Sequence, residues 1–226
     1  MRTILLSLFC ISVLNTTIAQ DADSLLSSLM VLDVRKPVQL FYPEEWLQTS
    51  IVLYSGDSVD GLEANYDLVN HWLIVRQVDV RKILQSYQVL SFRWIRADGS
   101  PERFINTAGF ETQEWLPGYF RAWGIEEVRL LELVRLPGND YTQREVMSGE
   151  SVHFVNPDQS RESEWFIAEG KALRTIALRK AKVMEALSPE WTETAKSLIK
   201  EHRLNLSQAE DVSLLLRHYS AWRRAQ

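Results

Sequence analysis

The sequence predicts an α+β fold in which a mainly antiparallel β-meander is followed by a C-terminal segment of three helices. In residues 61–76, apolar and polar residues alternate on both sides of a polar turn at 67–70, a pattern typical of a β-hairpin. Similar alternation continues to about residue 175. Beyond residue 178 the apolar residues are spaced as on helices, so the chain is expected to end in helical structure.

The other strands of the body are expected where alternating segments are separated by turns rich in Gly, Pro and Asp. In the strand expected at 87–96, the side chains of Leu90, Phe92 and Trp94 are expected to share one buried face. The other expected elements are strands at 49–54 and 78–84, hairpins at 87–106, 118–136 and 165–177, and loops at 111–117 and 140–163.

One short amphipathic helix is expected at 21–30, and three more helices close the chain. Ser188 is expected to cap the second of these three, with Pro189 at its first position. Ser207 and Glu210 form a predicted capping box at the start of the last helix. The apolar stripe of that helix is expected to bury against the strands. The stripe consists of Val212, Leu215, Leu216, Tyr219 and Trp222.

The first 19 residues have the parts of a secretory signal peptide. Arg2 is the positive region, an apolar run covers 4–14, and Ala19 is a small residue at the expected cleavage point. The apolar run is shorter than the roughly 20 residues that a membrane-spanning helix needs. Cleavage after Ala19 removes Cys10, the single cysteine of the sequence, so the mature chain is expected to contain no disulfide.

The predicted organisation is therefore a signal peptide at 1–19, a β-rich body at 20–177 and a helical segment at 178–226 that packs on the body. Such a chain is expected to be periplasmic or secreted. No transmembrane segment is expected in the mature chain, because no later stretch is long and apolar enough.

Charge is unevenly distributed along the chain, whose net charge is −5. Residues 171–226 contain 11 Lys+Arg and 6 Asp+Glu, a net charge of +5, while residues 20–170 carry −11. The opposite signs favour packing of the tail on the body, and binding of the tail to an anionic surface is the alternative. An acidic body also disfavours nucleic acid as the partner.

A set of short motifs extends over most of the chain beyond the signal segment. They are Gly61, 65–67, 73–75, Val89, Phe92, 118–120 and 128–131 in the body, and 166–171, 178–182, 200–206, 210–212 and Tyr219 towards the C-terminus. Together they resemble uncharacterised exported proteins of Bacteroidota. The resemblance implies a β-meander body with a helical tail and transfers no catalytic residue. The chain departs from the family pattern at Trp123 and Gly124, where the family has a more regular turn.

Gly56, Asp57 and Ser58 follow an apolar strand and resemble the first block of the Gly-Asp-Ser hydrolases, in which the serine is the nucleophile. A serine nucleophile needs a base within hydrogen-bond reach and a group that orients this base. The C-terminal Asp-x-x-His pair of that family has no counterpart, because Asp211 and His218 are too far apart in the sequence. Ser58 is therefore expected to be a turn residue.

No metal or cofactor site is expected. The histidines are not paired at metal-ligand spacing; they are His71, His153, His202 and His218. Asp57, Asp60 and Glu63 offer oxygen ligands suited to Ca²⁺, but they match no calcium-binding loop, and a solvated turn is the expected structure. Four of the eight tryptophans lie at core-facing positions of their expected elements and are expected to be buried: Trp72, Trp94, Trp191 and Trp222. Trp115 is the candidate for an exposed one.

The function that these observations predict is that of a non-catalytic structural or interaction module associated with the cell envelope. Its expected partner is an envelope protein or surface component, and no catalytic, cofactor-binding or metal residue is assigned. Two alternatives remain open at this point: a serine esterase that uses Ser58, and a carbohydrate-binding module that uses exposed tryptophan side chains.

Overall fold

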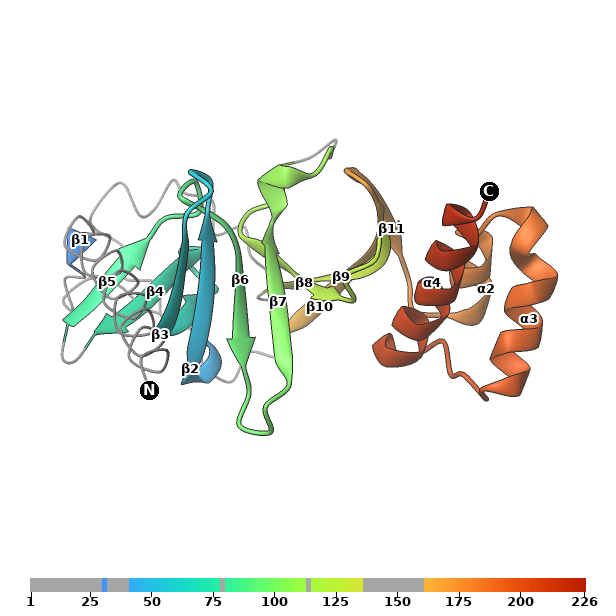
Figure 1. Cartoon of the computed structure of the whole chain (residues 1–226), viewed down its shortest axis with the longest axis horizontal. Helices are drawn as coiled ribbons and strands as arrows, with labels where there is room; N and C mark the ends of the chain where they lie inside the picture. The colour runs from blue at the N-terminus through green and yellow to red at the C-terminus, as the bar shows by residue number, and fades with distance from the viewer. Residues whose placement is uncertain (1–29, 32–40, 78–79, 113–114, 136–160) are drawn as a thin grey trace, which may run out of the picture. The chain divides into compact units, whose positions relative to one another are not determined.

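The structure is a computed structural model that describes residues 30–31, 41–77, 80–112, 115–135 and 161–226 (Figure 1). The expected signal peptide, residues 21–29 of the expected first helix and most of the expected loop at 140–163 lie outside these residues. The chain forms two compact units, Met1–Pro101 and Glu102–Gln226. The strand-rich part thus contributes to both units, and the C-terminal helices belong to the same unit as the later strands.

The first unit is an antiparallel set of strands in the order β1-β5-β4-β3-β2-β6. Strands β2 to β5 are sequential neighbours, and the chain then crosses to place β6 beside β2. The predicted hairpin at 61–76 is confirmed as β3 and β4, with Asp67 opposite Trp72. The strand bounds are Met30–Val31 (β1), Phe41–Leu53 (β2), Ser58–Asp67 (β3), Trp72–Gln77 (β4), Val80–Leu84 (β5) and Val89–Ile95 (β6).

The turn between β3 and β4 is held by the buried side chain of Asp67. Its carboxylate accepts the backbone N–H of Val69 at 2.9 Å and the side-chain amide of Asn70 at 2.6 Å. His71 completes the turn with φ +56°, and its Nδ1 lies 3.0 Å from the hydroxyl of Tyr66. An Asp that accepts backbone N–H groups two and three residues later is a common way to fix a tight turn.

The expected burial of Leu90 with Phe92 and Trp94 is wrong for Leu90, whose side chain is 38% exposed, whereas the two aromatic residues are buried. The reason is a β-bulge in the pairing of β6 with β2: Ser91 and Val89 face consecutive residues of β2, and Leu90 is the extra residue between them. A bulge shifts the alternation by one position. Val89 therefore takes the buried position.

The strands of the second unit follow one another in space as they do in sequence, in the order β7-β8-β9-β10-β11, and their pairings are antiparallel. This part of the chain confirms the predicted meander. The bounds are Pro101–Asn106 (β7), Tyr119–Trp123 (β8), Val128–Arg135 (β9), Glu162–Glu169 (β10) and Ala172–Ile176 (β11), with a 3₁₀ helix η1 at Thr107–Gly109.

Consecutive side chains on these strands enter two different apolar clusters, because alternate residues point to opposite faces. One face carries a cluster of Phe120, Leu131, Leu133, Phe166 and Ala168. The other face carries Val128, Leu130, Ile167 and Ile176, which pack with the C-terminal helices.

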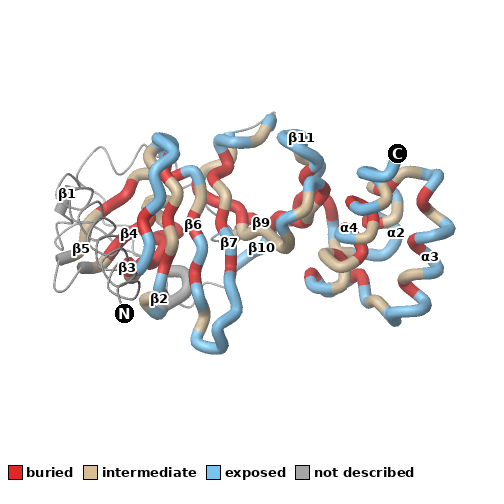
Figure 2. The backbone as a smooth tube through the Cα atoms, viewed as in Figure 1, coloured by how far each residue is buried: buried red, intermediate tan, exposed pale blue. Residues whose placement is uncertain are grey.

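The helical segment consists of α2 (Lys180–Glu185), the 3₁₀ helix η2 (Pro189–Trp191), α3 (Thr192–Glu201) and α4 (Ala209–Arg224). The α+β class with three C-terminal α-helices is therefore as predicted. Along α4, buried positions recur at helical spacing (Figure 2). The backbone N–H of Val128 donates to Ser220 Oγ at 3.3 Å, and the hydroxyl of Ser213 donates to the carbonyl of Trp123. These bonds join α4 to β8 and β9.

The start of the second helical piece differs from the expected cap at Ser188. Pro189 does occupy the first position of η2, but the side chain of Ser188 makes no capping hydrogen bond. Instead, the backbone N–H of Ser188 donates to the hydroxyl of Tyr219 at 3.3 Å. The connection is thus fixed by a side chain of α4 and not by a local cap.

The predicted capping box at Ser207 is also wrong, because α4 begins one residue later, with Gln208 as its N-cap and no side-chain cap bond. The side chain of Asn205 accepts the backbone N–H of Ser207 at 3.1 Å. In turn, the carboxylate of Asp211 accepts the backbone N–H of Asn205 at 2.7 Å. Asn and Asp side chains readily accept hydrogen bonds from nearby backbone N–H groups. Here these bonds fix the conformation of the segment that leads into α4.

Replacement of Gly124 by Ala is expected to destabilise the protein by about 1–3 kcal/mol, because Gly124 has φ +123° and only Gly adopts such backbone easily. A Cβ atom there would lie 2.5 Å from Glu126 Oε2, and Glu126 forms an ion pair with Arg217 of α4 at 3.2 Å. The matched control is Gly109→Ala, where a Cβ atom meets nothing within 4 Å. Denaturant unfolding of both variants checks the prediction. An equal loss of the free energy of unfolding in Gly124→Ala and Gly109→Ala would contradict it.

Candidate ligand-binding pocket

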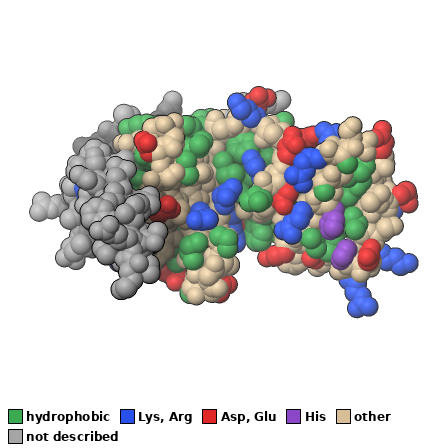
Figure 3. Space-filling model, in the orientation of Figure 1, with side chains coloured by type: hydrophobic (Ala, Val, Ile, Leu, Met, Phe, Trp, Pro, Cys, Tyr) green, Lys and Arg blue, Asp and Glu red, His purple; other side chains and the backbone are tan. Residues whose placement is uncertain are grey.

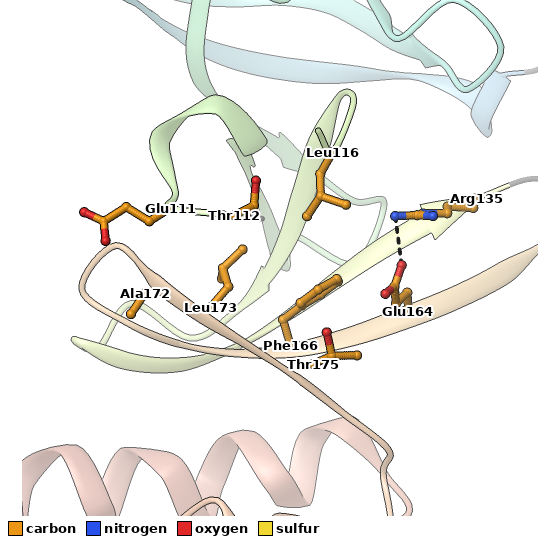
Figure 4. A pocket seen from close by; sticks show the side chains of 9 residues that line it. All are labelled: Glu111, Thr112, Leu116, Arg135, Glu164, Phe166, Ala172, Leu173 and Thr175. Carbon is orange, nitrogen blue, oxygen red and sulfur yellow. Dashed lines mark ion pairs between the residues drawn. The ribbon is translucent and has the colours of Figure 1, made fainter. Parts of the chain in front are cut away.

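The second unit contains an open pocket of about 620 Å³ on the face of β9, β10 and β11 that lies away from the helices. The loop after η1 forms its other wall (Figure 4). The pocket is lined by nine residues: Glu111, Thr112, Leu116, Arg135, Glu164, Phe166, Ala172, Leu173 and Thr175.

The wall-forming loop is attached at both of its ends. The hydroxyl of Thr107 bonds to the carbonyl of Leu116 at 2.5 Å and to that of Gly118 at 3.1 Å. The backbone N–H of Glu111 donates to the carbonyl of Lys171 at 2.9 Å. These bonds fix both ends of the loop beside the pocket, and ligand pockets are usually built from such pre-organised elements.

The floor of the pocket is apolar and rests on packed aromatic rings. Phe166 lies edge-on to Phe120, with ring centroids 5.1 Å apart, and Phe120 is edge-on to Phe110 at 5.3 Å. Leu116 and Leu173 pack against the same cluster. Edge-to-face aromatic packing of this kind gives a floor of defined shape.

A partly buried cation supports the loop from the side of Phe110. The guanidinium carbon of Arg129 lies 6.0 Å from the centre of the Phe110 ring, and Arg129 Nη1 donates to the carbonyl of Glu126 at 3.3 Å. Burial lowers the pKa of the Arg129 guanidinium, and the charge of Arg103 lowers this pKa further. Arginine nevertheless keeps its charge in proteins, so Arg129 holds a positive charge against the ring.

The rim of the pocket is polar. Arg135 Nη2 and Glu164 Oε2 form an ion pair at 2.9 Å, and their side chains are 45% and 36% exposed (Figure 4). Such pairs contribute little to stability, so this pair is free to rearrange around a ligand. Trp115, on the wall-forming loop, is 73% exposed, as the sequence suggests.

A buried polar cluster lies on the helix-facing side of β8 to β10, centred on Glu132. Its carboxylate accepts hydrogen bonds from Trp123 Nε1 at 3.0 Å and from the hydroxyl of Ser163 at 2.6 Å, and Arg121 Nη1 lies 3.3 Å away. Arg121 also forms an ion pair with the buried Glu102 and stacks on Trp123 at 4.1 Å. This cluster is not predicted from the sequence, because each charge alone fits a solvated face.

None of the residues that the sequence singles out for catalysis or metal binding is among those that line the pocket. Ser58 is the exposed first residue of β3, and Asp57 accepts a hydrogen bond from Ser55 at 2.7 Å. His202 and His218 stack on each other with ring centroids 5.9 Å apart, while His153 lies outside the described residues. The described part of the chain contains no group of three or more His, Cys, Asp or Glu that could hold a metal ion.

The surface of the helical segment is mixed in charge, with Lys, Arg, Asp and Glu side by side (Figure 3). Lys182 pairs with Glu185 at 2.8 Å, and Lys196 pairs with Glu193 at 2.6 Å. Among the helices that the structure describes, none is long and apolar enough to cross a membrane. Comparison of the chain with models of protein families, with curated proteins and with solved structures finds no match.

Proposed function

We propose that this chain is an exported, non-catalytic module of the cell envelope that acts by binding another molecule at the pocket of the second unit. The observation that carries this proposal is the largely exposed Trp115 on a loop that walls an apolar-floored pocket. Exposed tryptophans are costly to keep in water and are strongly enriched where proteins bind their partners.

The composition of the pocket supports binding. Its apolar residues, Leu116, Phe166 and Leu173, lie between polar groups of the loop and of the strands. Five of the nine lining residues are polar or charged, so the lining is mixed: the apolar floor can supply affinity, and the polar groups around it can fix the orientation of a ligand. The ion pair between Arg135 and Glu164 can exchange partners at little cost.

Export and envelope association are supported by the sequence of residues 1–19, which has the parts of a signal peptide. The resemblance to exported proteins of Bacteroidota supports the same location. The partner is therefore expected to be a periplasmic, secreted or surface-exposed molecule. On this proposal Ser58 has no catalytic role. The first unit then has a structural role or binds further partners.

A photo-crosslinking amino acid in place of Trp115 is expected to give a specific adduct in intact cells. The matched control is the same amino acid in place of Ile125, which is 72% exposed on the turn before β9. The substitution Leu173→Arg replaces an apolar side chain of the pocket by a long charged one and is expected to reduce the adduct at least about tenfold, because the charged group would have to lose water when an apolar group binds. Equal adducts at both positions, or no effect of Leu173→Arg, would contradict the proposal.

Trp115 also favours a second candidate, a carbohydrate-binding module, because an exposed indole ring can stack on a sugar ring. In this case glycans of the envelope should change the tryptophan fluorescence of the purified protein, and Trp115→Ala should remove this response. A response that survives Trp115→Ala would place sugar binding elsewhere.

A further inference from the structure

We propose that the ligand of the pocket is an extended peptide segment of another protein, which adds as a strand to the open edge of β11. This inference rests on the proposed binding function and specifies its ligand class. Three observations support it: the hydrogen bonding of the β11 edge, the direction of its remaining backbone groups, and the side chains that lie beside them.

Among the described residues, the edge of β11 pairs with an extended segment of the chain itself at one position. Glu111 forms an isolated parallel bridge with Ala172, and the N–H of Glu111 donates to the carbonyl of Lys171 at 2.9 Å. Within the described residues, this ladder does not continue past Ala172. The opposite edge of β11 is fully paired with β10, from Glu169 opposite Ala172 to Trp165 opposite Ile176.

The backbone groups of Leu173 and Thr175 point to the same open edge as the carbonyl of Lys171. In a strand, the N–H and C=O of one residue point to one edge, and those of the next residue point to the other. Since Lys171 faces away from β10, the carbonyl of Leu173 and both backbone groups of Thr175 also face away from it. A row of such groups is a template for another strand.

The side chains of the same two residues line the pocket (Figure 4). A strand that pairs with Leu173 and Thr175 therefore places every second side chain on the face of the sheet that carries the pocket, next to these two residues. Peptides recognised by strand addition obtain affinity from main-chain hydrogen bonds and specificity from pockets for alternate side chains. The occupant is thus an extended peptide with an apolar or aromatic side chain, since a helix or a sugar offers no matching row of donors and acceptors.

The first test uses a fluorescein-labelled peptide, Lys-Thr-Val-Thr-Phe-Thr-Val-Thr-Lys, and two versions methylated on the backbone nitrogens of alternate residues. One version carries the methyl groups on Val and Phe, and the other carries them on the inner Thr residues. One set of N–H groups must face β11, so one version is expected to bind at least about tenfold more weakly than the other. Fluorescence anisotropy measures the dissociation constants, and equal affinities or no binding of the parent peptide would overturn strand addition.

The second test changes the edge itself. Thr175→Pro removes an N–H that faces the open edge while leaving the bonds to β10 intact, and Pro is tolerated at such edge positions. Peptide binding is expected to weaken at least about fivefold, whereas Thr175→Val, which keeps the N–H, is expected to bind like the wild type. If a folded Thr175→Pro variant binds the peptide with wild-type affinity, the proposal is overturned. If this variant does not fold, the comparison of the two methylated peptides decides whether the peptide adds as a strand.

The two proposals fail in different ways. A pocket-dependent adduct at Trp115 without any difference between the methylated peptides means that strand addition is wrong while the binding function stands. Pairing of two copies of this chain through β11 is the competing occupant. It would appear in sedimentation as a dimer that Thr175→Pro abolishes and the peptide does not displace, and this outcome overturns the inference.

Discussion

Substitution of Leu215 by Ala is expected to lower the free energy of unfolding by about 2–5 kcal/mol. Leu215 is fully buried in the cluster that joins α4 to the strands of the second unit. Trp191 and Tyr219 belong to the same cluster and are in contact, with ring centroids 5.1 Å apart, so the cluster contains large rigid groups. Such groups collapse poorly into a new cavity, and the loss should lie in the upper part of the range.

The matched control is Leu214→Ala, which removes the same atoms from the adjacent, half-buried position. This variant is expected to lose clearly less free energy of unfolding than Leu215→Ala. Denaturant unfolding of the whole chain, with midpoint and slope compared, measures both losses. Truncation after Ser188 is the stronger version of the test, since it removes the burial partner of β9. An unchanged midpoint after truncation would show that the helices are an independent appendage.

The elements that the sequence predicts correctly are those whose signal is local. The hairpin of β3 and β4 is recognisable because Asp67 and Asn70 make a turn between two alternating segments. The hairpin of β10 and β11 is recognisable for the same reason, with Gly170 at φ +58° in its turn. The stripe of α4 follows from helical spacing alone. None of these signals depends on residues far away in the sequence.

The features that the sequence does not predict depend on distant partners. The bulge at Leu90 exists only in the pairing with β2, and β6 reaches β2 across the whole of β3, β4 and β5 in the sequence. The pocket depends on Thr107, whose hydroxyl reaches Leu116 and Gly118 across the loop. No local pattern marks Thr107 for this role.

The ion pair at the rim of the pocket is not predicted from the sequence for a related reason. Arg135 and Glu164 come from two strands that the sequence separates widely, and their ion pair follows from the register of β9 and β10. Register can be derived only when the connecting segment is short enough to fix it. Trp115, by contrast, was found from the sequence because a loop tryptophan beside Pro117 has little to bury against.

Substitution of Arg121 by Met is expected to lower the free energy of unfolding by about 3–5 kcal/mol, the typical cost of leaving buried charges without their partner. Arg121 lies between the carboxylates of Glu102 and Glu132, which are only 6% and 9% exposed, and is itself 20% exposed. Met retains much of the packing against Trp123 but removes the charge. The two carboxylates then lose the cation that they share, and denaturant unfolding at neutral pH measures the cost.

A triple variant separates the loss of charge from the loss of packing. When Arg121→Met is combined with Glu102→Gln and Glu132→Gln, the cluster has no charge and most of the stability is expected to return, since neutral replacements of buried ion pairs are often tolerated. The amide oxygen introduced by Glu132→Gln can still accept a hydrogen bond from Trp123 or Ser163, as the native carboxylate does. If the triple variant is as unstable as Arg121→Met alone, the contribution of Arg121 is packing on the Trp123 ring, and the charge argument is wrong.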